Sequence, residues 1–392
     1  MGAFEPLRQR GFALFFAGQV VSNVGTWFQN LALQLVVLAA TGSAQALSGV
    51  TVAQFLPILV WGVLAGRLAD RVRPRTILLV TSALAAAVAA SLGVVVAAEE
   101  PDLILIYAGV GALGTVQTFE RIAAQTIIFE LVGPASLSRA VSISTIALAA
   151  ARSIGPGLAG IAFAQLGAPA CMLANAASFA LVGVSLLLIR PRSLHPRPVA
   201  GSERVRAGDL LRDRSVSTLL LVNVVVALFA MNFGLVLTAT VDLTYGGDAQ
   251  AVGLAHSLNA VGAIVGGGLA AMLPRVGVRS LVPATAAFGI ALLLTAGAPT
   301  LALFLLAGPL LGLAIGYYQG VVNSAAQSSA RPEAIGRVMS LVTLGSYGMV
   351  PFGGLLMGWV IDASSGRMSL AIGGLAALAC GAFVAVRVPR RP

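Results

Sequence analysis

Long apolar runs dominate the hydropathy pattern of this chain. Twelve stretches are mostly apolar over roughly 20 residues or more, which is the length that an α-helix needs to cross a bilayer, and turn residues or charges separate them. The pattern predicts an all-α membrane protein with twelve transmembrane helices. The expected spans cover residues 11–40, 46–68, 76–98, 102–128, 139–166, 168–189, 216–243, 249–272, 280–297, 299–327, 338–361 and 367–387.

Composition agrees with this pattern and narrows the class of protein. Of the 392 residues, 58% are apolar and 10% are charged, and the mean hydropathy is +0.94. Soluble domains carry roughly 25% charged residues, so a soluble enzyme and a disordered chain are excluded. The two cysteines, Cys171 and Cys380, both lie inside apolar runs, which argues against a disulfide scaffold.

The net charge of +10 comes from arginine alone, because the chain contains no lysine. All 24 arginines but Arg121, Arg152 and Arg367 fall at the termini or in alternate connections between the expected spans. Positive residues concentrate on the cytoplasmic side of membrane proteins. The distribution therefore predicts that both termini are cytoplasmic, and it removes the argument for nucleic-acid binding. The Arg-only, Ala- and Gly-rich composition suggests a bacterial plasma membrane.

The two halves of the chain look like a duplication. A basic, proline-containing linker over 190–215 separates an expected N-terminal six-helix bundle (1–189) from a C-terminal one (216–392). Two sets of residues recur with their spacing preserved: Pro134, Arg139 and Ser142 as Pro332, Arg337 and Ser340, and Gly62, Arg71 and Arg75 as Gly266, Arg275 and Arg279. Six-span repeats of this kind are typical of secondary transporters.

The connection after the second span carries a more specific motif. Its residues run GRLADRVRPR from Gly66 to Arg75. They resemble the loop signature G-x-x-x-D-R/K-x-G-R-R/K of the major facilitator superfamily, with matches at Gly66, Asp70, Arg71 and Arg75 and departures at positions 73 and 74. The resemblance covers the whole chain and implies the superfamily fold of two pseudo-symmetric bundles. It also implies that these four residues form a gating motif.

Further motifs point to a branch of that superfamily. The run GPGLAG in the fifth span, with Gly155, Pro156 and Gly160, resembles the antiporter signature of drug-efflux proteins and predicts a bent, tightly packed helix. The segments 41–43, 336–340 and 351–354 resemble the enterobactin-exporter and macrolide-efflux proteins. This branch implies a drug:proton antiporter.

Three charged residues lie well inside expected spans, away from the span ends, where charge is costly and usually functional. Glu120 and Arg121 belong to the fourth span and Arg152 to the fifth. Side chains of this length can bridge adjacent spans, so we expect Glu120 to pair with Arg152 or Arg121 and to carry the proton in antiport. A permanent structural ion pair is the alternative.

Polar side chains form stripes on otherwise apolar helices. In the first span they recur every three or four residues and so share one helix face, which we expect to line a cavity. The resemblance adds spans four, seven and ten to the lining. The expected substrate-cavity residues are Gln19, Asn23, Trp27, Asn30, Gln125, Asn232, Tyr317, Gln319 and Asn323. Such an uncharged, amide- and aromatic-lined cavity suits a bulky amphipathic solute.

These features predict a secondary active exporter of hydrophobic or amphipathic small molecules, either drugs or siderophore-like compounds, that works by alternating access with proton antiport. Two alternatives remain: a lipid or lysophospholipid flippase on the same fold, and a non-transporting membrane sensor. The expected partners are a small-molecule substrate, a proton and membrane lipids, with the chain a monomer. Metal-ligand spacings and nucleotide or nucleophile motifs do not occur, so no metal, cofactor or enzymatic activity is expected.

Overall fold

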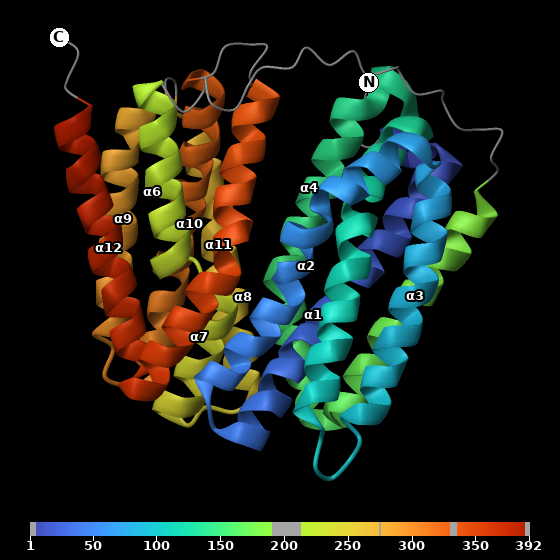
Figure 1. Cartoon of the computed structure of the whole chain (residues 1–392), viewed down its shortest axis with the longest axis horizontal. Helices are drawn as coiled ribbons and strands as arrows, with labels where there is room; N and C mark the ends of the chain where they lie inside the picture. Colours follow the sequence, from blue (N-terminus) through green and yellow to red (C-terminus); the bar gives the residue numbers. More distant parts are fainter. Residues whose placement is uncertain (1–4, 190–212, 274–275, 330–334, 389–392) are drawn as a thin grey trace. The chain divides into compact units, whose positions relative to one another are not determined.

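The computed structural model describes residues 5–189, 213–273, 276–329 and 335–388 (Figure 1). In these ranges all regular structure is helical. The long helices are α1 (Arg10–Thr41), α2 (Ala44–Arg71), α3 (Pro74–Val95), α4 (Leu103–Leu188), α6 (Arg214–Ala230), α8 (Ala249–Ala271), α9 (Leu281–Ala296), α10 (Leu301–Ser329), α11 (Ile335–Ala363) and α12 (Gly366–Arg387). Short helical elements are η1 (Glu5–Arg8), α7 (Phe233–Ala239), η3 (Thr240–Thr244) and η4 (Val278–Ser280).

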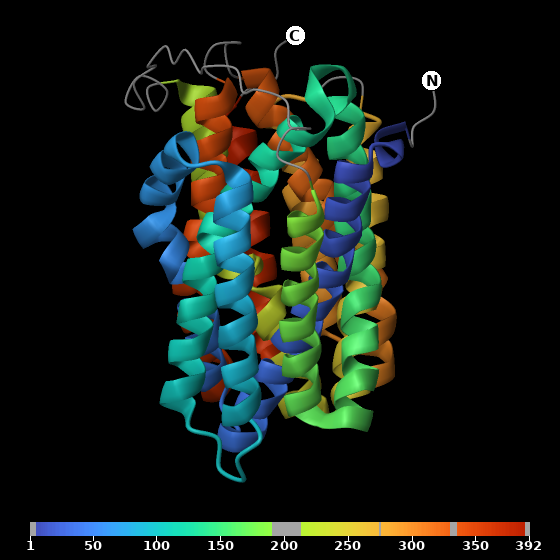
Figure 2. The same ribbon diagram turned by 90° about the vertical axis from the view of Figure 1, so that its right-hand side faces the viewer.

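Helix α4 contains more than one crossing. Its 86 residues include non-helical backbone at Gly133 (φ 66°) and Gly167 (φ 78°), a region of φ that side chains other than glycine rarely adopt. These two glycines divide α4 into three segments, and Figure 2 shows the last two running side by side.

The number of crossings follows from these lengths. In the described part of the chain, eleven helical stretches are long and apolar enough to cross a membrane, and one of them, Ser136–Leu188, has 53 residues. At about 1.5 Å per residue it is roughly 80 Å long, more than twice the hydrocarbon thickness of a bilayer. Because it turns at Gly167, it supplies two crossings. The prediction of an all-α protein with twelve transmembrane helices is thus confirmed.

The seventh span is interrupted. Helix α6 ends at Ala230, Met231 and Asn232 have non-helical dihedral angles, and α7 continues from Phe233 into the π-helical turn η3. The hydropathy pattern did not predict this break, because Met231 and Asn232 are neither glycine nor proline. A break in a span frees backbone groups that need other partners in an apolar environment.

The chain forms two compact units. Unit 1 contains residues 1–40 and 53–200, and unit 2 contains residues 41–52 and 201–392. The first residues of α2 therefore belong to unit 2, although the rest of that helix belongs to unit 1. The predicted linker over 190–215 lies mostly outside the described residues, as does the C-terminal end from residue 389.

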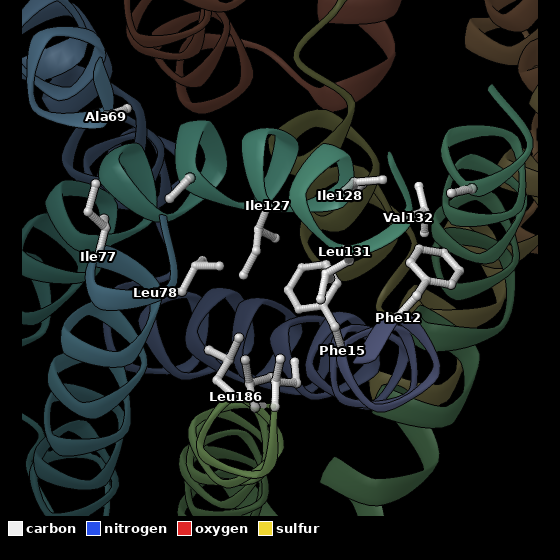
Figure 3. Close-up of a cluster of buried hydrophobic side chains, with 14 residues drawn as sticks. Phe12, Phe15, Ala69, Ile77, Leu78, Ile127, Ile128, Leu131, Val132 and Leu186 are labelled. Atoms are coloured by element: carbon white, nitrogen blue, oxygen red, sulfur yellow. The ribbon is translucent and has the colours of Figure 1, made fainter. Parts of the chain in front are cut away.

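Unit 1 is built around a continuous apolar core (Figure 3). Phe12 and Phe15 of α1 pack there against the first segment of α4, and Leu186 approaches from the end of α4. Helix α1 comes close to the last segment of α4 through small residues, since a Cβ atom on Gly18 or Gly25 would contact Ser185 or Ser178. Glycine therefore allows the first and sixth spans to approach each other closely.

Unit 2 uses the same device between α8 and α10. A Cβ atom on Gly262 or Gly266 of α8 would collide with backbone atoms at Pro309 or Leu313 of α10. Reciprocally, a Cβ atom on Gly312 would collide with the backbone of Asn259. The two helices are thus in backbone contact along several turns, an arrangement that only glycine permits.

Candidate transport site

Glu120 lies in the first segment of α4, half-buried within unit 1. Its carboxylate has Arg121 and the side chain of Gln19 from α1 as polar neighbours. The amide nitrogen of Gln19 is buried. The site therefore joins one acid, one base and one amide at a place where two spans meet.

The structure does not pair Glu120 with Arg152. Arg152 is exposed on the second segment of α4, and no ion pair between these two described residues is present. The charged neighbour of Glu120 is Arg121, which was the other expected partner. The similar depth of Glu120 and Arg152 within their expected spans suggested this pairing. Depth does not determine the direction in which a side chain leaves its helix.

A second acid lies inside the same segment of α4. Glu130 is 6% exposed and belongs to the candidate span Leu103–Pro134. Sequence reasoning missed it because the expected span ended at residue 128, whereas the helix continues to the turn at Gly133. Glu120 is therefore not alone among acids within the spans of unit 1.

Helix α1 carries two polar faces. The expected stripe of Gln19, Asn23, Trp27 and Asn30 is half-buried throughout. Another face, not expected from the sequence, carries Gln29, which is buried.

Gln29 takes part in a buried polar cluster. The Nδ2 group of Asn175, on the last segment of α4, donates a hydrogen bond to Gln29 Oε1 at 2.8 Å, and the Ser178 hydroxyl donates to Asn175 Oδ1 at 3.0 Å. These three buried side chains satisfy one another. The cluster holds the first and sixth spans together and leaves the half-buried stripe as the candidate lining.

The antiporter-like run packs against that stripe. A Cβ atom on Gly155 would lie 2.8 Å from the Trp27 indole, so glycine is required where the fifth span meets the first. Pro156 and Gly160 are buried on the same helix segment. The small residues thus bring the helix against an expected lining residue.

The expected gating motif divides into parts with different surroundings. Arg75 donates from Nε to the Leu186 carbonyl at 3.0 Å and from Nη2 to the Leu187 carbonyl at 3.5 Å, so it caps the end of the sixth span. Arg71 is exposed, and a Cβ atom on Gly66 would meet open space. The side chain of Asp70 lies outside the described residues, so its expected gating role stays a prediction.

Unit 2 repeats the Arg75 contact at the position that the sequence repeat predicts. Arg279 donates from Nη1 to the Val388 carbonyl at 2.7 Å, directly after the end of α12. Cations are stabilising at helix C-termini, where carbonyl groups lack intrahelical partners. Both copies of this arginine therefore cap the last helix of their own half.

Asn232 has a structural part in unit 2. It is 5% exposed, and its Nδ2 group donates to the carbonyls of Ala227 and Leu228, which the break in the seventh span leaves free. A crevice of about 10 Å³ adjoins the break. Pockets that bury a drug-sized ligand measure roughly 300–1,000 Å³, so this crevice is too small for a bulky cargo.

The remaining expected lining residues are accessible within their own units. Gln125 in unit 1 is exposed, as are Gln319 and Asn323 in unit 2, and Tyr317 is half-buried. Exposed amides in the middle of apolar helices are unfavourable against lipid. Their positions are consistent with contact to water or solute.

Comparison with protein families decides the class of this chain. The family model described as "Transmembrane secretion effector" matches residues 1–391. The chain belongs to this family of the major facilitator superfamily. Its members are membrane transporters, so the resemblance found in the motifs is confirmed.

Relatives of this chain include two named bacterial transporters. The staphyloferrin A transporter of Staphylococcus aureus is 26% identical over 361 residues, covering 89% of each chain. The multidrug efflux pump Tap of Mycolicibacterium fortuitum is 26% identical over 393 residues, covering 96% of this chain and 95% of Tap.

Solved structures agree on the fold. A bacterial homologue of the iron transporter ferroportin, solved in its inward-facing state, aligns with a TM-score of 0.76 at 16% identity and covers 97% of this chain and 99% of that one. At such low identity the likeness shows the fold alone.

Proposed function

We propose that this transporter exports hydrophobic or amphipathic small molecules and that proton entry through Glu120 drives the export. The observation that carries the proposal is Glu120 itself, placed inside a span beside Arg121 and Gln19. An ionised carboxylate at such depth is costly, and protonation removes the cost. Burial favours the neutral form of this carboxyl group, whereas the cationic and amide neighbours favour the charged form, so both forms have support within the site.

The half-buried stripe on α1 supports the choice of cargo. Amides and an indole offer hydrogen bonding and stacking without fixed charge, which suits a bulky amphipathic solute better than a phosphate or an amino acid. The two named relatives, one a siderophore transporter and one a drug pump, are compatible with cargo of this kind. We further propose alternating access with both termini in the cytoplasm, because the arginines concentrate on that side.

The direct test of coupling is a Glu120→Gln variant in proteoliposomes with an imposed pH gradient. We expect gradient-driven movement of a fluorescent amphipathic dye to fall at least about tenfold, since the amide cannot carry the proton. Dye exchange without a gradient should persist. Glu100→Gln, which removes an exposed acid before α4, is the control and should transport like the parent protein. If Glu120→Gln retains gradient-driven export, the carrier assignment is wrong.

The same vesicles distinguish export from lipid flipping. A panel of dyes, drugs and siderophores is compared with fluorescent lysophospholipids, each with and without a protonophore. Export predicts protonophore-sensitive movement of the soluble compounds. Movement of lipid alone would favour the flippase, and movement of neither would favour a sensor.

A further inference from the structure

The start of α2 is attached to the end of α11 by one carboxylate in unit 2. Asp362 Oδ2 accepts a hydrogen bond from the Ser43 hydroxyl at 2.5 Å and from the Gln45 amide at 3.0 Å. Its Oδ1 atom accepts from the Ala44 amide at 2.7 Å. One charged group thus receives three hydrogen bonds from the first turn of a helix, where free N–H groups and the helix dipole both favour an anion.

This contact differs from the other acid caps of the described helices. Asp102, Asp213 and Asp248 each cap the helix that immediately follows them in the chain. Asp362 caps a helix more than 300 residues away, because the Ala44 contact spans 318 positions. Helix α2 also has a local cap, since the Ser43 hydroxyl accepts a hydrogen bond from the Ala46 amide at 3.1 Å. Asp362 is therefore not needed to cap the N-terminus of α2. Its contact instead joins two helices that are distant in the sequence.

Small residues extend the contact along α11. A Cβ atom on Gly358, one turn before Asp362, would lie 2.8 Å from the Ala44 carbonyl and 3.0 Å from Ser48 Cβ. One turn earlier, a Cβ atom on Gly354 would lie 3.4 Å from Thr51. Positions 354, 358 and 362 share one helix face, and this face follows the first turns of α2. Ser48 is buried beneath it, with 0% exposure.

Helix α2 passes from unit 2 into unit 1 just after the residues that contact α11. Residues 41–52 belong to unit 2, whereas α2 from residue 53 onward belongs to unit 1. Because α2 is continuous to Arg71, the Asp362 contact holds the first turn of a helix whose remainder belongs to unit 1. Hydrogen bonds of this kind can open and re-form, unlike the covalent chain.

We propose that Asp362 is a latch residue: it holds the start of α2 on α11 in one state of the transport cycle and releases it in the other. The latch rests on the proposed export by alternating access, since only such a cycle requires release. Asp362 positions α2 and needs no contact with the cargo. Release exposes the face of α2 that carries Ser48.

A cysteine at position 48 reports on the latch. Ser48→Cys changes one atom, and the native Cys171 and Cys380 are buried, so a polar maleimide should label the new thiol only when α2 leaves α11. In the purified full-length protein in nanodiscs, we expect Asp362→Ala to speed this labelling on the order of tenfold, because three charge-assisted hydrogen bonds are lost together. Asp362→Asn, which keeps an acceptor without the charge, should fall between the two.

The matched control is Asp248→Ala, which removes an acid that caps only its own helix α8. It should leave labelling at the parent rate. If Asp362→Ala proves unstable, Ser43→Ala removes one of the three bonds to Asp362, together with the local cap on the Ala46 amide, and should speed labelling by a smaller factor. Unchanged labelling in both Asp362→Ala and Ser43→Ala, or equal acceleration by Asp248→Ala, would overturn the latch.

Transport measured in the same preparations separates this proposal from the proposed function. A parent protein that moves no cargo, but whose Ser48→Cys labelling responds to Asp362→Ala, would refute export and leave a mobile α2. A parent protein that exports cargo, with labelling indifferent to Asp362, would refute the latch and leave export standing.

Discussion

The buried amide pair of unit 1 shows what single polar residues do inside a span. Asn175 is 0% exposed and donates to Gln29 Oε1. Removing one partner leaves the other buried without a hydrogen bond, which costs about 1–3 kcal/mol in soluble proteins. Between transmembrane helices the measured coupling averages about 0.6 kcal/mol.

We therefore predict that Asn175→Ala lowers the free energy of unfolding by about 1 kcal/mol. In a double-mutant cycle with Gln29→Ala, the second substitution should then cost little, because the bond is already lost. Unfolding of the solubilised protein in increasing SDS measures each term. Additive effects of the two substitutions would show that the bond contributes nothing.

At the scale of elements, glycine decides which helices touch. Gly266 and Gly268 lie two residues apart on α8, yet a Cβ atom on Gly266 would collide with the Leu313 backbone, whereas one on Gly268 would meet nothing within 4 Å.

Replacing each glycine by alanine should therefore have opposite effects on stability. Gly266→Ala forces α8 and α10 apart and should cost about 1–3 kcal/mol. Gly268→Ala gains helix propensity and should be neutral or stabilising by up to about 1 kcal/mol. The melting temperatures of the two variants, measured side by side, check both signs. Similar shifts would contradict the close packing of α8 on α10.

The helices could be predicted from hydropathy, but the turns and breaks that join helical segments could not. Each expected span corresponds to a helical stretch, since roughly 20 apolar residues have few other solutions in a bilayer. The positive φ of Gly133 and Gly167 cannot be read from composition, because most glycines of the chain lie in ordinary helix. The break at Met231 and Asn232 depends on carbonyl capping by an amide side chain. That capping depends on a tertiary arrangement without a local signal in the sequence.

At the candidate site, the types of residue could be predicted better than the direction in which their side chains point. An acid inside the fourth span was evident at Glu120, and the stripe on α1 followed from its spacing. Which neighbour faces the acid depends on helix rotation, so Arg121 rather than Arg152 is adjacent. Likewise Gln29 was not distinguished from the stripe residues, because burial against the sixth span is decided by the small residues Gly18 and Gly25.

At the scale of the whole molecule, the internal repeat appears in equivalent contacts. Arg75 and Arg279 each cap the last helix of their own half.

Replacing either arginine by alanine should weaken that helix end by about 1 kcal/mol. Hydrogen exchange should then quicken near residues 184–189 in Arg75→Ala and near residues 382–388 in Arg279→Ala, with no change in the other half. Arg73→Ala, next to Arg75 but exposed, is the control and should leave exchange unchanged. Loss of protection in both halves from one substitution would contradict independent capping.

The joints within α4 also constrain how this chain can change in evolution. The fifth span is connected to its neighbours through Gly133 and Gly167 without intervening loops. A single inserted residue at Gly133 would rotate the fifth span by about 100°, turning Gly155 away from Trp27 and replacing it there with a larger side chain. An insertion at Gly167 would rotate the sixth span in the same way. Insertions and deletions are therefore far more disruptive at residues 133 and 167 than in the turn between α3 and α4, where residues 96–102 lie outside the helices. The fourth, fifth and sixth spans can vary by substitution, but they are fixed in length.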